Sequence, residues 1–206
     1  MKSCLIVIDV QESFRHRPFF TEQSLPAYLA AQNALIAGCV ARGVPVVRVF
    51  HCDGPAVPAN PFSAESGQVR PLAGLAAFDA VATVTKSRHS ALVGTGLEVW
   101  LTQQGIGRLI VSGIRTEQCC ETTTRHASDL GWQVDFVTDA TLTWDMVQPD
   151  GQPLAAADIK ARTATVLQGR FATLCTVDEA LARCAASHAT PMSGGFGLGR
   201  ASSVTA

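Results

Sequence analysis

The chain has 206 residues, and its 16 Lys and Arg side chains against 17 Asp and Glu leave a formal net charge of −1. This balance gives no reason to expect a nucleic acid or an anionic membrane as a partner. No apolar run approaches the roughly 20 residues that a membrane-spanning helix needs, and residues 1–4 leave no room for a signal peptide. We therefore predict a cytoplasmic protein with one domain over residues 1–186.

Seven cysteines are scattered along the chain, at positions 4, 39, 52, 119, 120, 175 and 184. No Cys-x-x-Cys spacing occurs, so neither a zinc site nor a thioredoxin-like motif is indicated. Most of these thiols are expected to be reduced and buried as small hydrophobic groups. We expect neither a metal nor another cofactor.

The first apolar run, residues 4–8, predicts a buried strand that stops at Asp9. A carboxylate there lies at the carboxyl edge of a parallel sheet, where open α/β folds bind ligands, unless it only caps a turn. Gln11, Phe14 and the basic loop 15–17 then either line a pocket or form a solvated loop.

A helix is predicted over residues 25–42 and a second strand over residues 45–50. His51 and Asp53, at the end of this strand, are either metal ligands or a loop histidine and a turn aspartate.

The proline-rich and glycine-rich stretch 54–77 is long for a loop, and loops of this length are usually functional. Phe62 within it either lines a pocket or fills a small satellite core. A third strand over residues 80–85 leads directly to Lys86, and His89 lies in the polar turn that follows.

Thr95 and Glu98 have the spacing of a capping box and predict the start of the next helix. Residues 109–111 then form a short apolar strand, and a helical pattern runs from about residue 117 to Leu130. Cys119 lies in the first turn of this helix, where unpaired N–H groups and the helix dipole favour a thiolate.

The last third of the chain continues the alternation of strands and helices. The predicted elements are a strand over residues 133–137, a helix over 155–168, a short strand within 170–176 and a helix opened by a capping box of Thr176 and Glu179. Together, six strands with helices between them predict an open, mostly parallel sheet covered on both faces. The tail at 187–206 is rich in Gly and Ser, and our hypothesis is that it packs on a neighbouring subunit through Phe196 and Leu198.

Asp9, Lys86 and Cys119 each follow a predicted strand, so a doubly wound sheet gathers them at one rim. Asp9 can take the proton of Cys119, and Lys86 can hold Asp9 and stabilise developing negative charge. Backbone N–H groups of the turn 114–119, those of Arg115 and Cys119 among them, would form an oxyanion hole. This chemistry is acyl transfer through a thioester, followed by hydrolysis.

Three sequence blocks carry a family resemblance. They are Ile8-Asp9-Val10-Gln11 with Phe14; Lys86 with Ser90-Ala91, Gly94-Thr95 and Leu97; and Gly113-Ile114-Arg115-Thr116-Glu117-Gln118-Cys119 with Glu121, Thr122, Thr123 and Ala127. In this order and spacing, over residues 5 to about 140, the chain resembles the isochorismatase-like cysteine hydrolases. That family includes nicotinamidases and N-carbamoylsarcosine amidohydrolases.

The resemblance implies a catalytic triad of Asp9, Lys86 and Cys119, a cis peptide between Ile114 and Arg115, and a small-molecule substrate. It also implies a three-layer α/β/α sandwich with a six-stranded, mostly parallel sheet, assembled as a homodimer or homotetramer. The expected substrate-binding residues are Gln11, Phe14, Phe62, His89, Arg115 and Trp144.

Two positions depart from the family pattern. The nicotinamidase branch has an Asp-x-His metal motif after the second strand, whereas this chain has His51-Cys52-Asp53. Arg115 stands where many members have a small residue; it either pairs with a substrate carboxylate or forms a salt bridge with Glu117.

We therefore predict a cysteine hydrolase that cleaves the carbon–nitrogen bond of a small amide, carbamoyl or ureido compound. The alternatives are hydrolysis of an isochorismate-like ether, against which the presence of Cys119 argues, and a non-catalytic binding or scaffold protein. A nucleotide-binding protein is not supported, because no Gly-x-Gly-x-x-Gly follows the first strand.

Overall fold

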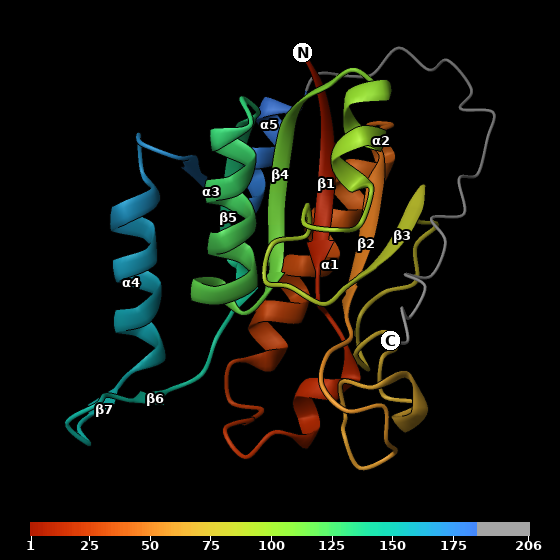
Figure 1. Ribbon diagram of the computed structural model, residues 1–206. Coiled ribbons are helices and arrows are strands. Elements are labelled where there is room, and N and C mark those ends of the chain that lie inside the picture. The colour runs from red at the N-terminus through yellow and green to blue at the C-terminus, as the bar shows by residue number, and fades with distance from the viewer. Residues whose placement is uncertain (185–206) are drawn as a thin grey trace.

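A six-stranded sheet forms the centre of the molecule in the computed structural model, which describes residues 1–184 (Figure 1). The strands run in the order β3-β2-β1-β4-β5-β8, and all neighbouring pairs are parallel. Their bounds are Lys2–Ile8 for β1, Val46–His51 for β2, Ala82–Lys86 for β3, Ile106–Ile114 for β4, Gln133–Leu142 for β5 and Thr173–Cys175 for β8. The predicted parallel sheet is confirmed, whereas the hypothesis about the tail at 187–206 lies outside the described residues.

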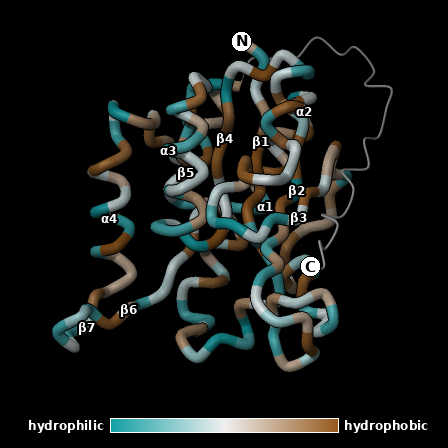
Figure 2. Tube along the Cα trace, in the orientation of Figure 1, coloured by the Kyte–Doolittle hydropathy of each residue, from teal (hydrophilic) through white to brown (hydrophobic). Residues whose placement is uncertain are grey.

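Helices cover both faces of this sheet and make three layers. The helices are α1 (Leu25–Ala41) and α5 (Val177–Arg183) on one face, and α2 (Leu97–Gln103), α3 (Glu121–Asp129) and α4 (Ala156–Leu167) on the other. One buried apolar cluster lies under α1 and α5, and a second lies under α2 and α3. The strands between them are predominantly hydrophobic (Figure 2), because a parallel sheet that is covered on both faces buries both sets of side chains.

Short elements occupy several of the connections. They are the 3₁₀ helices η1 (Glu12–His16) and η2 (Ala64–Ser66), the π-helical turn η3 (Thr116–Cys120) and an antiparallel pair of strands, β6 (Met146–Val147) and β7 (Pro153–Leu154). The sequence did not predict β6 and β7. Among the helices of residues 1–184, none has the length and apolar character needed to cross a membrane.

Of the two predicted capping boxes, that of Thr176 and Glu179 is confirmed: the side chains and backbone N–H groups of these two residues bond reciprocally. The box of Thr95 and Glu98 is wrong. The residue that precedes α2 is Gly96, with a φ of 70°, and it has no side chain with which to cap the helix. Thr95 thus lies one position too early for the spacing to work.

Gly113 allows β4 to approach β1 directly before the turn that carries Cys119. It is paired with Ile8 in the sheet register, and its φ is 130°. A Cβ atom built on Gly113 would lie 2.0 Å from the carbonyl oxygen of Ile8, which is backbone and therefore cannot move aside easily. Glycine is thus required where the ends of β1 and β4 bring Asp9 and Cys119 together.

Candidate active site

Three side chains that follow strands of the sheet meet at its carboxyl edge. Asp9 follows β1, Lys86 ends β3, and Cys119 lies in the turn η3 that follows β4. Oδ2 of Asp9 lies 2.7 Å from Nζ of Lys86, and the same Nζ lies 3.2 Å from Sγ of Cys119. Asp9 and Lys86 are buried, while Cys119 is 6% exposed. The structure therefore brings together the three residues that the sequence places at one rim.

The backbone of Asp9 has an unusual conformation for a residue other than glycine. Its φ is 53°, and it is the one non-glycine residue with a positive φ in the described part of the chain. Aspartate adopts this left-handed region more readily than most residues. Such conformations cluster at functional sites, so this observation agrees with the position of Asp9 at the site.

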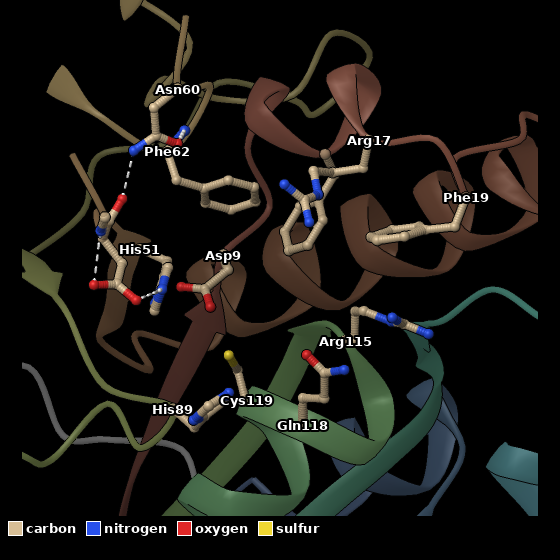
Figure 3. Close-up of a pocket in the computed structure, with 13 residues that line it drawn as sticks. Asp9, Arg17, Phe19, His51, Asn60, Phe62, His89, Arg115, Gln118 and Cys119 are labelled. Atoms are coloured by element: carbon tan, nitrogen blue, oxygen red, sulfur yellow. Dashed lines mark hydrogen bonds and ion pairs between the residues drawn. The ribbon is translucent and has the colours of Figure 1, made fainter. Parts of the chain in front are cut away.

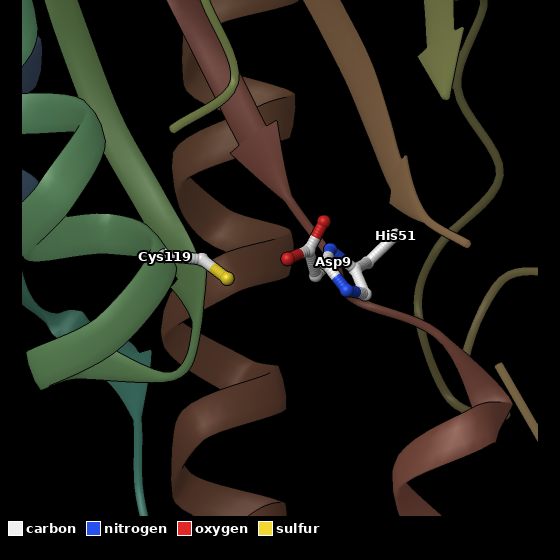
Figure 4. A group of neighbouring side chains, drawn as sticks. All are labelled: Asp9, His51 and Cys119. Carbon is white, nitrogen blue, oxygen red and sulfur yellow. The ribbon is translucent and has the colours of Figure 1, made fainter. Parts of the chain in front are cut away.

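A fourth side chain, that of His51 at the end of β2, completes the surroundings of Lys86. Its Nδ1 lies 2.9 Å from Nζ of Lys86. An ammonium group has three N–H donors, and here there is one acceptor for each: Oδ2 of Asp9, Nδ1 of His51 and Sγ of Cys119. Figure 4 shows the three acceptor side chains facing one another. The sequence does not indicate this lysine as the partner of His51.

The same three side chains have a spacing that a metal ion accepts, with their ligand atoms within 4.8 Å of one another. Nζ of Lys86, however, lies within 3.2 Å of one possible ligand atom of each residue, namely Oδ2 of Asp9, Nδ1 of His51 and Sγ of Cys119. Since an ammonium cation already stands between Asp9, His51 and Cys119, these residues do not fit a second cation. We assign no metal to this cluster.

Burial and neighbouring charges determine the protonation states of the cluster. Burial and the Lys86 ammonium lower the pKa of His51 to about 4, so its ring is neutral at pH 7. Burial raises the pKa of the Asp9 carboxyl, although Lys86 opposes this effect. For Lys86 itself, burial would lower the pKa, but Asp9 and Cys119 raise it above its ordinary value.

The helix start favours a thiolate at Cys119, but burial outweighs this effect. Burial and the Asp9 carboxylate raise the pKa of the Cys119 thiol well above its ordinary value, and the opposing effect of Lys86 is smaller. The helix dipole is a local effect that cannot outweigh the burial of a side chain only 6% exposed. Any reaction in which Cys119 acts as a nucleophile therefore requires a group that accepts its proton.

A cavity of about 460 Å³ opens onto Asp9, His51 and Cys119 (Figure 3). Its walls include four of the predicted pocket residues, Phe14, Phe62, His89 and Arg115, and also Arg17 of the loop 15–17, for which a pocket was one of the two alternatives. The other lining residues besides Asp9, His51 and Cys119 were not predicted to line a pocket; they are Phe19, Asp53, Gly54, Asn60 and Gln118. Two of the aromatic rings, those of Phe14 and Phe62, meet edge to face with centroids 5.2 Å apart. Aromatic walls with a few polar groups and this volume are typical of sites for small molecules.

Gln11 and Trp144 lie outside the cavity wall, which corrects their predicted role as substrate-binding residues. The fully buried Gln11 bonds the backbone of His51 instead: Nε2 donates to its carbonyl at 3.0 Å and Oε1 accepts from its N–H at 2.7 Å. The ring of Trp144 packs on that of Phe14 with centroids 5.8 Å apart, and its indole N–H donates to the carbonyl of Thr21. Both residues support the cavity from behind.

The side chain of Arg115 lines the cavity, but its charge is paired with a carboxylate. Nε lies 3.1 Å from Oε1 of Glu117, and the guanidinium also donates to the hydroxyl of Thr143 and the carbonyl of Trp144, each at 3.1 Å. Of the two alternatives for Arg115, the structure therefore contains the salt bridge with Glu117. The peptide bond between Ile114 and Arg115 is cis.

The stability of the protein is expected to depend on pH through His51. An unfolded histidine has a pKa of about 6.5, whereas that of folded His51 is about 4. Between these values the unfolded state binds more protons, so the stability falls as the pH falls from 6.5 towards 4. At pH 5 this group alone is expected to remove about 2 kcal/mol from the free energy of unfolding at neutral pH.

Urea denaturation of the wild type and of His51→Asn, at pH 7.5 and at pH 5, measures this contribution. The variant has no ring to titrate, so its loss of stability between the two pH values should be smaller by about 2 kcal/mol. An equal loss in both proteins would contradict the assignment of a lowered pKa to His51.

The sequence and the fold are both similar to those of known proteins. Residues 3–170 match the family model of the isochorismatase domain. Over 182 residues the chain is 28% identical to the uncharacterized isochorismatase family protein YrdC of Bacillus subtilis (strain 168), an alignment that covers 86% of this chain and 94% of that protein. A crystal structure of a proposed isochorismatase from Burkholderia xenovorans LB400 is 33% identical with a TM-score of 0.77, covering 87% of this chain and 86% of that one. A stretch of 62 residues is 44% identical to Nicotinamidase 3 of Arabidopsis thaliana, over 30% of this chain and 31% of that protein.

Proposed function

Because this chain belongs to the isochorismatase family of hydrolases, we propose that it is a cysteine hydrolase that cleaves the carbon–nitrogen bond of a small amide, carbamoyl or ureido compound. One observation carries the proposal: the Cys119 thiol opens onto the cavity and contacts the Lys86 ammonium, which is paired with the Asp9 carboxylate. A nucleophile, a cation and a proton acceptor thus lie beside a space of the size of a small molecule.

In the proposed first half-reaction, Sγ of Cys119 bonds to the carbonyl carbon of the substrate while the thiol proton passes to Asp9. The carbon–nitrogen bond then breaks, and Asp9 gives the proton to the leaving nitrogen, so ammonia or an amine departs from a thioester. The raised pKa of Asp9 suits this role, because a buried carboxylate accepts a proton more readily than an exposed one. Lys86 stabilises the negative charge as it moves between Asp9 and Cys119.

The second half-reaction regenerates the thiol. A water molecule attacks the thioester carbonyl, and Asp9 accepts its proton as the new carbon–oxygen bond forms. The carbon–sulfur bond then breaks, and the proton returns from Asp9 to Sγ of Cys119. The acyl group leaves as an acid, and the site is restored to its initial protonation state.

We assign the stabilisation of the intermediate's oxyanion to the backbone N–H groups of Arg115 and Cys119. The turn that carries them is fixed by two hydrogen bonds onto the carbonyl of Arg115, from the N–H groups of Gln118 at 3.3 Å and of Cys120 at 3.2 Å. A turn that is already ordered can present its donors without reorganising during the reaction, which is the requirement for electrostatic stabilisation of this kind.

An amide-type substrate is favoured over an isochorismate-like ether. The position of Cys119 in the cavity wall supports it, as does the similarity of a 62-residue stretch to a nicotinamidase. A non-catalytic binding protein does not need a buried lysine that donates to a thiol in the cavity wall. The contact between Lys86 and Cys119 therefore argues against that alternative.

Ammonia release from a panel of small amide, carbamoyl and ureido compounds tests the proposed function. We expect at least one compound to be hydrolysed, and we expect iodoacetamide to abolish the activity in proportion to the labelling of Cys119, read by peptide mass spectrometry. The neighbouring Cys120 is fully buried and serves as an internal control that should stay unlabelled. A panel in which no compound is hydrolysed, although Cys119 can be labelled and is therefore reached from the cavity, would favour the binding protein.

A further inference from the structure

We infer that His51 is a positioning residue that holds the Lys86 ammonium between Asp9 and Cys119. The inference rests on the proposed function and adds a fourth side chain to the site. The topology of the sheet places His51 next to Lys86. Strand β2 lies between β1 and β3, so His51 ends the strand that separates Asp9 from Lys86. His51 and Lys86 are moreover paired residues in the register of β2 and β3.

The need for such a residue follows from the chemistry of a buried lysine. Its ammonium stands on a flexible chain of four carbons, and a donor that is buried without an acceptor is costly. Asp9 and Cys119 provide two of the three acceptors, and Nδ1 of His51, at 2.9 Å, provides the third. With all three donors used, the ammonium has one satisfied orientation, and that orientation contacts both Asp9 and Cys119.

The ring of His51 is suited to accept this bond permanently. Lys86 and His89 both disfavour a charged ring, Asp53 favours one, and burial with Lys86 lowers the pKa to about 4. The neutral ring with its proton on Nε2 leaves Nδ1 free to accept from Lys86, and Nε2 faces Oδ2 of Asp53 at 3.9 Å. His51 therefore keeps the same tautomer and the same bond throughout the neutral pH range.

The position of His51 is fixed by Gln11, the buried residue whose amide bonds both the N–H and the carbonyl of His51. Nε2 of Gln11 is further bonded to the hydroxyl of Ser13 at 2.7 Å, which orients the amide. On its other side, the ring of His51 meets the edge of Phe62 with centroids 5.8 Å apart. Contacts from the chain after β1 and from the loop 54–77 thus hold the ring in place.

The variants His51→Leu and His51→Asn form a matched pair to test this role. The two side chains have the same number of non-hydrogen atoms and the same branching at Cγ, but only asparagine has an acceptor near the position of Nδ1. For His51→Leu we expect kcat to fall about tenfold with KM little changed, and the pH profile of Cys119 labelling by iodoacetamide to move to higher pH. His51→Asn should restore kcat to within about threefold of the wild type. The exposed residue His16, at the end of η1, supplies the control variant His16→Leu, for which neither quantity should change.

Two outcomes would overturn the inference. A folded His51→Leu protein with the kcat and labelling profile of the wild type would show that Lys86 needs no third acceptor. Equal increases in KM for both variants, with kcat unchanged, would show that His51 binds substrate instead. Failure of the proposed function is recognised separately, because it leaves wild-type protein without ammonia release, while the labelling profiles of the variants still report on Lys86.

Discussion

A Cys119→Ala variant is expected to lose hydrolysis of every substrate of the wild-type protein, with a fall of about 10³-fold or more in kcat/KM. Within residues 1–184, Cys119 is the one cysteine in the cavity wall, and its Sγ contacts the ammonium of Lys86. No other side chain can form the thioester there, so the loss should appear in kcat. Ammonia release at equal protein concentration measures it, with circular dichroism to show that the variant is folded.

Cys120→Ala is the matched control, since it removes the same atom from the adjacent residue. The Cys120 side chain is fully buried in the apolar cluster under α2 and α3. We expect kcat/KM within about threefold of the wild type and a loss of stability of about 1 kcal/mol from the small void. Equal losses of activity in the two variants, or full activity of Cys119→Ala, would contradict the assignment of the nucleophile.

The position of Asp9, Lys86 and Cys119 at one edge could be predicted because it depends on a simple regularity. Short apolar runs that stop at a polar residue mark the carboxyl ends of buried strands, and parallel strands bring those ends to the same side. The sheet order then places β1 between β2 and β4, which the sequence pattern does not specify. Because of this order, the three residues at the edge are also in contact: Nζ of Lys86 lies 2.7 Å from Oδ2 of Asp9 and 3.2 Å from Sγ of Cys119.

The other features of the site depend on contacts between side chains that no local pattern encodes. The sequence identifies His51 as a polar residue at a strand end, but its bond to Lys86 depends on the register of β2 against β3. Gln11 is near Asp9 in the chain, yet its buried amide turns to His51 instead of the cavity. The direction in which the pKa of Cys119 is shifted could not be predicted for the same reason: the helix dipole can be recognised locally, whereas burial and the charge of Asp9 arise from the tertiary structure.

An Asp9→Asn variant is expected to change two reactions of Cys119 in opposite directions. Hydrolysis should fall by about 10²- to 10⁴-fold, because no carboxylate remains to carry the proton from the thiol to the leaving nitrogen. Alkylation by iodoacetamide, in contrast, needs only the thiolate, because its leaving group, iodide, does not have to be protonated. Since the Asp9 charge raises the pKa of the Cys119 thiol, its removal should move the labelling profile to lower pH.

A Lys86→Met variant provides the comparison, because it removes the opposite charge from the same ion pair. Lys86 lowers the pKa of Cys119, so this variant should move the labelling profile to higher pH, away from that of Asp9→Asn. Each variant leaves a buried charge without its partner and is expected to cost about 3 kcal/mol or more of stability, so both assays are run well below the measured Tm. If Asp9→Asn slowed hydrolysis and labelling by the same factor, Asp9 would only shape the site. If the hydrolysis rate of Asp9→Asn remained within tenfold of the wild type, another group would carry the proton. If both variants lost hydrolysis while their labelling profiles moved in opposite directions, Asp9 and Lys86 would both be required for hydrolysis, with opposite effects on the pKa of Cys119.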